Sequence, residues 1–238
     1  MAEMSEKSVR RRYGQGMQIA FVVYPGMTAL DAIGPYELLR SIPNSEIRFV
    51  APAPGKIVTD SGVLVLGATH SFDETPSPDI VLVPGGSNGT VGAMNDKALI
   101  SWLQAVHPKT AWTTSVCSGA LILAMAGLLQ GVPATTHWVC QEVLGSMGAI
   151  PQPDKRIVHA GKIVTAAGVS AGIDLALWLI GEICGPDQAK RSQVEIEYDP
   201  QPPYDAGHPS KISPEMLEEV RSKLIADAQK ATVATTSW

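Results

Sequence analysis

The sequence predicts an α/β protein built on a doubly wound, mostly parallel sheet with helices on both of its faces. Short apolar runs rich in β-branched residues recur along the chain, as is typical of strands buried inside a parallel sheet. Segments of helical periodicity and two hairpins separate these runs, which is the alternation expected of such a fold. The 238 residues, 45% of them hydrophobic, are enough for one domain with a large core.

The first predicted strand, 18–23, is a nearly continuous apolar run that ends at a Tyr-Pro-Gly turn. Helical spacing resumes after this turn, and proline is favoured in a first helical turn, so we expect a helix to begin near Pro35. Asp31 is then left in the loop at the carboxyl end of the first strand. Open α/β sheets carry their chemistry at this edge.

Two further strands are expected at 47–51 and 79–83, with a hairpin across 57–66 between them. The strand 79–83 leads directly into a turn that contains Gly85 and Gly86. Because these residues have no side chains, the backbone N–H groups of the turn can approach a ligand. We therefore expect Gly85 and Gly86 to bind substrate or a developing oxyanion.

The next part of the chain predicts a helix over 96–106 and then a sharp strand-to-helix turn. A β-rich run over 111–116 is followed by Cys117, a small residue, a glycine and an apolar run of helical length over 120–126. A thiol at the N-terminus of a helix meets unpaired N–H groups, which favour the thiolate. The alternative is that Cys117 is a buried small hydrophobic residue.

The remaining elements continue the alternation and end in a polar tail. In chain order they are an extended segment at 135–137, an amphipathic run over 138–147, a hairpin over 157–166, a helix over 173–184 that a Gly-Pro pair ends, a helix over 188–197, a Pro-rich segment over 199–214 and a polar helix over 214–230. This pattern predicts a flexible N-terminal extension (1–16), one α/β domain (17–198) and a C-terminal tail (199–238).

Composition excludes several classes of protein. The net charge of −5 gives no general attraction to nucleic acid, and no apolar run approaches the roughly 20 residues that span a bilayer. Three widely spaced cysteines suggest neither a disulfide framework nor a zinc knuckle, so we expect a cytoplasmic protein. The basic start of the chain lacks the long apolar segment of a twin-arginine export signal, which is the less favoured alternative. Scattered histidines without helical i,i+4 pairs predict no metal site.

Three of the candidate groups follow different predicted strands and therefore converge at one edge of the sheet. Asp31, Gly85 and Cys117 are these groups. Apolar neighbours help Asp31 to keep its proton, so it can act as an acid or base near neutral pH, although a lone aspartate is usually a cap or a solvated charge. His137 is the first histidine after Cys117, and either lines this site or only hydrogen-bonds a neighbour. Asp174, by contrast, is predicted to be a charge at a helix terminus.

The order of five motifs resembles that of the ThiJ/PfpI superfamily, which belongs to the class I glutamine amidotransferase-like proteins. The motifs are Asp-Ala-Ile-Gly-Pro at 31–35, Val-Pro-Gly-Gly at 83–86, Ser-Val-Cys-Ser-Gly-Ala at 115–120, Ala-Thr-Thr-His-Trp at 134–138 and Ala-Gly-Ile-Asp at 171–174. The resemblance is strongest to the branch of cysteine enzymes that hydrate isonitriles. The ligand-sensing domains of AraC-type regulators share most of the motifs.

The resemblance implies a flavodoxin-like fold and a homodimeric enzyme without a cofactor that adds water to a small-molecule isonitrile to give an N-substituted formamide. Carried over to this chain, it makes Cys117 the nucleophile, Asp31 the acid/base group and Ser118 the neighbour of the nucleophile, where related hydratases tend to have threonine. Isonitrile hydration needs a sulfur nucleophile and a proton carrier but no histidine base, which agrees with the absence of histidine beside Cys117.

Other functions stay open at this stage. A histidine next to the nucleophile would be typical of the peptidase branch, and a His-x-Glu motif of a glutamine amidotransferase; neither is present. The alternatives are a ligand-sensing or redox-sensing domain without turnover, or another cysteine hydrolase or glyoxalase of the superfamily.

Overall fold

The computed structural model describes residues 16–229, so all but one residue of the predicted N-terminal extension lies outside the described residues. These residues form a seven-stranded sheet in the order β10-β11-β7-β6-β1-β2-β5. Its strands are β1 (Met17–Val22), β2 (Ser45–Ala51), β5 (His70–Ser71), β6 (Ile80–Val83), β7 (Trp112–Val116), β10 (Ile157–Ala160) and β11 (Ile163–Ala166). β10 and β11 pair antiparallel, and every other pair in the sheet is parallel. The predicted α/β fold class is confirmed.

The apolar runs identified in the sequence form the middle of this sheet. β1 and β6 lie side by side, with Ile19 opposite Ile80, and all four residues of β6 are buried. Strands covered on both faces need apolar residues at consecutive positions, which explains why these runs do not alternate with polar residues. Two pairs of short strands stand apart from the sheet. They are the antiparallel hairpin β3 (Gly55–Val58) and β4 (Val65–Ala68), and β8 (Pro133–Ala134) with β9 (Ile150–Pro151).

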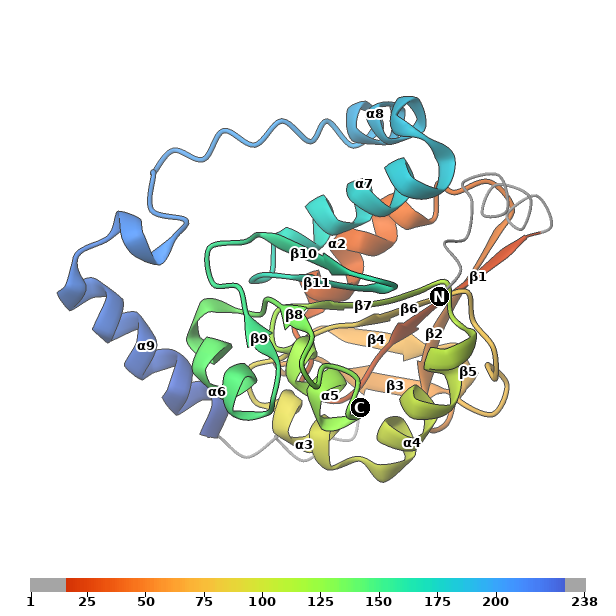
Figure 1. The fold of residues 1–238 in the computed structure, drawn as a ribbon, viewed down its shortest axis with the longest axis horizontal. Helices are drawn as coiled ribbons and strands as arrows, with labels where there is room; N and C mark the ends of the chain where they lie inside the picture. The colour runs from red at the N-terminus through yellow and green to blue at the C-terminus, as the bar shows by residue number, and fades with distance from the viewer. Residues whose placement is uncertain (1–15, 230–238) are drawn as a thin grey trace.

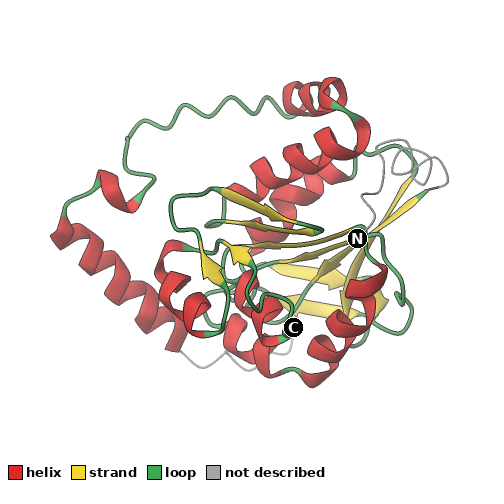
Figure 2. Ribbon diagram, in the orientation of Figure 1, coloured by secondary structure: helices red, strands yellow, loops and turns green. Residues whose placement is uncertain are grey.

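Helices cover the sheet in two layers (Figures 1 and 2). α2 packs against α7 in one layer, and α3, α4 and α5 lie together in the other. The helices are α2 (Ala29–Leu39), α3 (Gly89–Asn95), α4 (Lys97–Val106), α5 (Gly119–Met125), α6 (Gln141–Ser146), α7 (Ala171–Cys184), α8 (Pro186–Glu195) and α9 (Pro214–Gln229), with short 3₁₀ turns η2 (His107–Lys109), η3 (Trp138–Cys140) and η4 (Pro209–Lys211). After α8 an extended segment runs along the edge of the molecule and returns as α9 (Figure 1).

The predicted start of the first helix is wrong. α2 begins at Ala29, so Pro35 lies inside it and Asp31 sits in its first turn instead of in the preceding loop. A proline there removes the hydrogen bond to the carbonyl oxygen of Asp31. Close packing on α7 explains why this position suits proline: a Cβ on Gly172 would lie 2.9 Å from Pro35 Cγ. The Gly-Pro pair at 34–35 therefore allows α2 to pack closely on α7 and does not mark the start of a helix.

Helix α3 was not predicted. The turn that contains Gly85 and Gly86 follows β6 as expected, but a helix begins after it at Gly89, because tertiary contacts outweigh the low helix propensity of glycine. The segment 135–137 belongs to no strand and comes directly after the short strand β8, which ends at Ala134. Both hairpins, the strand before Cys117 and the polar helix of the tail lie where they were predicted. The division into extension, domain and tail stays a prediction.

The order of the strands places the site. From β1 the chain first adds β2 and β5 on one side and then returns to add β6, β7 and β11 on the other. The direction of winding therefore switches between β1 and β6, and in open α/β sheets ligands bind at the carboxyl ends of the strands beside such a switch. Asp31 follows β1, Gly85 follows β6 and Cys117 follows β7.

Candidate active site

Cys117 occupies a strained turn between β7 and α5. Its φ angle is 57°, in the left-handed region that residues other than glycine rarely adopt. The backbone around it holds this conformation, since its N–H donates to the carbonyl oxygens of Ala166 (3.2 Å) and Ala167 (2.9 Å). Its own carbonyl oxygen accepts a hydrogen bond from Thr136 Oγ1 at 2.8 Å. Strain maintained by this many bonds is characteristic of functional sites.

The turn after β6 holds Asp31 and Ser118 in place. The N–H of Gly85 donates to Asp31 Oδ2 at 2.8 Å, and the N–H of Gly86 donates to Ser118 Oγ at 3.1 Å. Both amides are therefore engaged within the protein. In this structure the N–H groups of the two glycines hold side chains of the protein and are not free oxyanion donors. Gly86 nevertheless lines the cavity beside Cys117, and its contact with a substrate stays a prediction.

Gly85 is also where the turn after β6 comes closest to the turn that contains Cys117, between β7 and α5. A Cβ on Gly85 would lie 2.5 Å from both Ser118 N and Ser118 Oγ, and 3.0 Å from Asp31 Oδ2. We expect Gly85→Ala to lower the free energy of unfolding by about 1–3 kcal/mol, because the extra carbon overpacks a buried contact. Urea denaturation followed by circular dichroism measures this change.

Gly92 provides the matched control for this substitution. It lies inside α3, and a Cβ there meets no atom within 4 Å. Gly92→Ala should therefore raise the free energy of unfolding by roughly 0.5–1 kcal/mol through helix propensity. Equal stabilities of the two variants would show that the contact at Gly85 is not tight.

Asp31 is a buried carboxyl group held next to the Cys117 thiol. Its side chain is fully excluded from solvent, and Oδ1 has no hydrogen-bond partner among the described residues. Burial raises the pKa of Asp31 to about 7, although the Gly85 amide and the Cys117 thiol favour the charged form and lower it. Asp31 therefore gains or loses a proton near neutral pH, as a group that carries protons during a reaction must.

Cys117 is a protonated thiol in this resting arrangement. Burial raises the pKa of the thiol well above its usual value, and the negative charge of Asp31 raises it further. The backbone N–H groups of Ser118 and Val169 favour the thiolate and oppose this shift, but burial dominates. The N–H groups at the helix terminus thus favour the thiolate, as predicted, but their effect is smaller than that of burial.

Val169 and Thr90 are site residues that the sequence analysis did not identify. Val169 follows β11, a fourth strand that ends at the same edge of the sheet. Thr90 lies in the first turn of α3, where its Oγ1 is 2.8 Å from Ser118 Oγ and donates to the carbonyl oxygen of Gly86 at 2.7 Å. The predicted strand before Val169 could have identified Val169 as a residue at the edge of the sheet. Nothing in the sequence pattern identified Thr90, because helix α3 was not predicted.

A cavity of about 170 Å³ opens beside Cys117 and Ser118. No charged side chain is among the described residues that line the cavity. Asp31 does not line it but contacts Cys117, which does. Its apolar lining comes from α3, α5, η3 and α9, with Val91, Met94, Leu121, Val139, Leu224 and Ala228 as examples. Such a cavity suits a small, uncharged and mainly apolar molecule.

The other predicted groups divide between this cavity and the surface. His137 lines the cavity, and burial lowers its pKa, so it is neutral; its Nδ1 accepts a hydrogen bond from the N–H of Val139 at 3.4 Å. Cys140 packs against the core and also lines the cavity. Asp174 pairs with Arg156 at 2.5 Å and accepts a hydrogen bond from the Tyr198 hydroxyl, as a surface charge does.

Within residues 16–229, no three His, Cys, Asp or Glu side chains come together as a metal site would require. None of the helices in this part of the chain combines the length and the apolar character needed to cross a bilayer.

Comparison with known proteins supplies the family. Residues 17–182, which contain Asp31, Cys117 and all seven strands of the sheet, match the family described as DJ-1/PfpI. This chain is a member of the DJ-1/PfpI family. The resemblance that the five sequence motifs indicated is thus confirmed.

Relatives within the DJ-1/PfpI family include enzymes and regulators. The chain is 36% identical to isonitrile hydratase of Pseudomonas putida, over 92% of this chain and 95% of that protein. A crystal structure of a ThiJ/PfpI family protein from Pseudomonas syringae superposes with a TM-score of 0.82 at 34% identity, and covers 96% of this chain and 97% of that one. The HTH-type transcriptional regulator CdhR of Pseudomonas aeruginosa is 26% identical over 71% of this chain, but only over 51% of its own length.

Proposed function

We propose that this DJ-1/PfpI protein hydrates an isonitrile to an N-substituted formamide through a covalent thioimidate on Cys117. The observation that carries the proposal is the pairing of a buried thiol with a carboxyl group whose pKa lies at about 7, at the wall of an uncharged cavity. Two features support it. The relative that shares 36% identity over almost the whole chain is an isonitrile hydratase, and no imidazole is a partner of the thiol among the described residues.

In the first step, sulfur and a proton add to the isonitrile carbon. Asp31 accepts the proton of the Cys117 thiol, which changes the resting pair into a thiolate and a neutral carboxyl group. The sulfur then forms a bond to the terminal carbon of R–N≡C, and Asp31 delivers the proton to the same carbon. The product is the thioimidate R–N=CH–S–Cys117. Amides of Ser118 and Val169 beside the sulfur stabilise its charge during this transfer.

In the second step, water releases the product. Its oxygen bonds to the thioimidate carbon, one of its protons goes to the nitrogen, and the C–S bond breaks as the carbonyl forms. The second water proton passes through Asp31 to the sulfur, so the thiol and the carboxylate return to their starting state. The sum of both steps is R–NC plus water to R–NH–CHO. We assign His137 to the cavity wall and Ser118 to the support of the turn at Cys117. Neither residue takes part in a proton transfer.

The proposed mechanism predicts a single ionisation in the pH profile. The active form of the Cys117–Asp31 pair carries one proton, on the thiol. Below about pH 7 the carboxyl group of Asp31 binds a second proton and can no longer accept the one from the thiol. We expect kcat/KM to fall about tenfold per pH unit below this value and to level off above it. Initial rates of formamide formation between about pH 5 and 8 test this, with circular dichroism to show that the fold persists. A flat profile would exclude Asp31 as the proton carrier.

A turnover assay across substrate classes tests the proposal itself. Purified protein is incubated with small alkyl isonitriles, the corresponding amides and glyoxal-type aldehydes, and the products are quantified by mass spectrometry. We expect formamide from the isonitriles and no turnover of the other two classes. Turnover of amides or aldehydes alone would replace the proposal with a hydrolase or glyoxalase, and saturable binding without any product would indicate a sensor. The homodimer and the cytoplasmic location stay predictions.

A further inference from the structure

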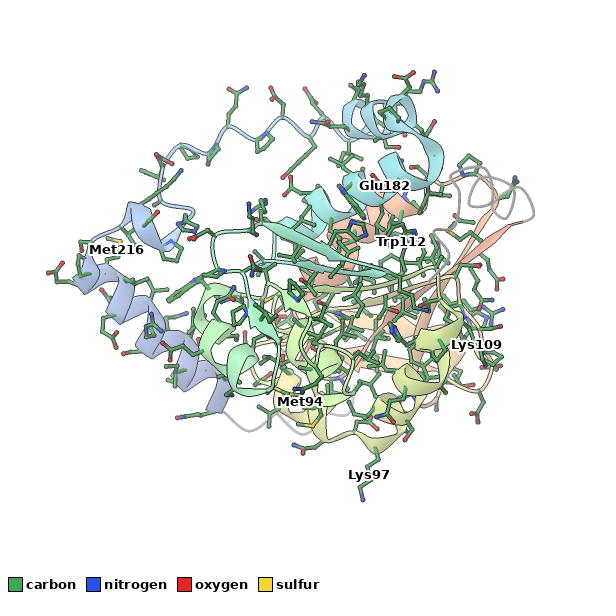
Figure 3. All side chains as sticks on the ribbon, viewed as in Figure 1. Met94, Lys97, Lys109, Trp112, Glu182 and Met216 are labelled. Atoms are coloured by element: carbon green, nitrogen blue, oxygen red, sulfur yellow. The ribbon has the colours of Figure 1, made fainter. Side chains whose placement is uncertain are left out.

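Helix α9 forms one wall of the cavity beside Cys117, although it is the last helix of the described chain. Leu224 and Ala228, one helical turn apart, line the cavity together with Cys117. Figure 3 shows how the helix lies: Met216, in its first turn, is at the left edge of the view, and the helix runs from there towards the lower part of the molecule, where Met94 of α3 is labelled. Met94 lines the same cavity.

The inward face of α9 is continuous but weakly buried. Leu217, Arg221, Leu224 and Asp227 are half-buried at helical spacing, and the other residues of α9 are exposed, including Ala228, which lines the cavity. No residue of α9 is fully buried. The guanidinium group of Arg221 lies 5.1 Å from the centre of the Trp138 ring, in the 3₁₀ turn that follows His137. This cation–π contact joins α9 to the segment beside the cavity.

The rest of the cavity wall belongs to the family domain. Val91, Met94, Leu121, Val139 and Val169 all fall within residues 17–182, which match the DJ-1/PfpI family, whereas α9 begins at Pro214. The alignment with isonitrile hydratase covers 92% of this chain and so extends beyond this domain, whereas that with the regulator CdhR covers 71%. The α9 wall is therefore an addition to the shared domain.

We propose that α9 closes the active-site cavity and that Leu224 and Ala228 determine which N-substituents it accepts. This inference rests on the proposed isonitrile hydration and deepens it. The substrates would carry compact, uncharged, apolar substituents, because a cavity of about 170 Å³ with no charged lining among the described residues accepts neither a long chain nor an ionised group. Leu224 fills space that a larger substituent needs, and Ala228 leaves space that a larger side chain would remove.

Paired substitutions on α9 test this assignment. Leu224→Ala removes three carbon atoms from the wall, and Ala228→Leu adds three. We expect Leu224→Ala to raise the ratio of kcat/KM for a bulky isonitrile, such as the 1-adamantyl compound, to that for the methyl compound by about tenfold or more. Ala228→Leu should lower the same ratio by a similar factor. These are opposite changes in selectivity, which loss of stability cannot produce.

The controls are substitutions of the same size at residues of α9 that do not line the cavity. Ile225 and Ala226 are exposed and do not line the cavity. Ile225→Ala and Ala226→Leu should leave the selectivity ratio within about twofold of the wild-type value. Unchanged ratios in Leu224→Ala and Ala228→Leu, with normal turnover of methyl isonitrile, would overturn the inference and leave the proposed function intact.

A second readout does not depend on hydration. Cys117 is alkylated with iodoacetamide and with its bulkier N-benzyl derivative, and the modified peptide is quantified by mass spectrometry. We expect Leu224→Ala to increase the rate of the bulky reagent relative to the small one by about tenfold, and Ala228→Leu to decrease it. If the wild-type protein does not hydrate isonitriles, this ratio still decides whether α9 controls access. Equal ratios in all variants would show that it does not.

Discussion

Cys117→Ala is expected to abolish formamide production, with a fall in kcat on the order of 10⁴-fold or more. The proposed reaction forms a carbon–sulfur bond in its first step, so no other group in the cavity can replace the thiol. Cys117→Ser should be almost as inactive, because a buried hydroxyl gives up its proton to a carboxylate far less readily than a thiol does. Mass spectrometry of product after timed quenching measures both losses.

Cys184→Ala is the matched control for the loss of a thiol. Cys184 ends α7, is half-buried and does not line the cavity. Turnover in this variant should stay within about twofold of wild type. In wild-type protein quenched early, we also expect the mass of one isonitrile on the peptide that contains Cys117. Undiminished formamide production by Cys117→Ala would exclude covalent catalysis at this residue.

The parts of the site that the sequence predicted are those fixed by local pattern and by a rule of sheet geometry. The two apolar runs that became β1 and β6 and the β-rich run that became β7 each end at a chemically distinctive residue or turn. Carboxyl ends of parallel strands meet at one edge, so the meeting of Asp31, Gly85 and Cys117 could be expected without knowledge of any contact. The hydrogen bond from the Gly85 N–H to Asp31 joins two of these segments across the switch between β1 and β6.

The parts that could not be predicted depend on tertiary contacts between distant segments. Pro35 looked like a helix start, but its role is set by Gly172, which is far along the chain. The protonation state of the Cys117 thiol could not be predicted, because the helix terminus that favours the thiolate is a local feature, whereas the burial that outweighs it comes from the whole fold. Leu224 and Ala228 lie in a polar helix whose pattern carries no sign of a cavity, since only one narrow stripe faces inward.

Asp31→Asn is expected to reduce kcat by roughly 10²–10⁴-fold, the usual range for loss of a group that transfers protons. The amide is almost the same size as the carboxyl group and can still accept the hydrogen bond from the Gly85 N–H. It cannot accept the thiol proton, so Cys117 stays a thiol and its sulfur stays a weak nucleophile. Asp174→Asn is the control, since this carboxylate also lies in the first turn of a helix but pairs with Arg156 at the surface. Its turnover should be unchanged.

The free energy of unfolding of Asp31→Asn shows whether the variant is inactive because it lacks the carboxyl group or because it no longer folds. Because the pKa of Asp31 is raised from 3.8 to about 7, the folded state binds more protons than the unfolded state between these values. The contribution of Asp31 to the free energy of unfolding therefore falls as pH rises from about 4 to 7, by roughly 4 kcal/mol for a shift of this size, and stays constant above it. The amide side chain has no charge to bury, so Asp31→Asn should lose this decline and be at least as stable as wild type at about pH 8. Urea denaturation across this range measures both effects. An inactive variant that is also much less stable at about pH 8 would mean that Asp31 maintains the fold, and that its proton is not what the reaction uses.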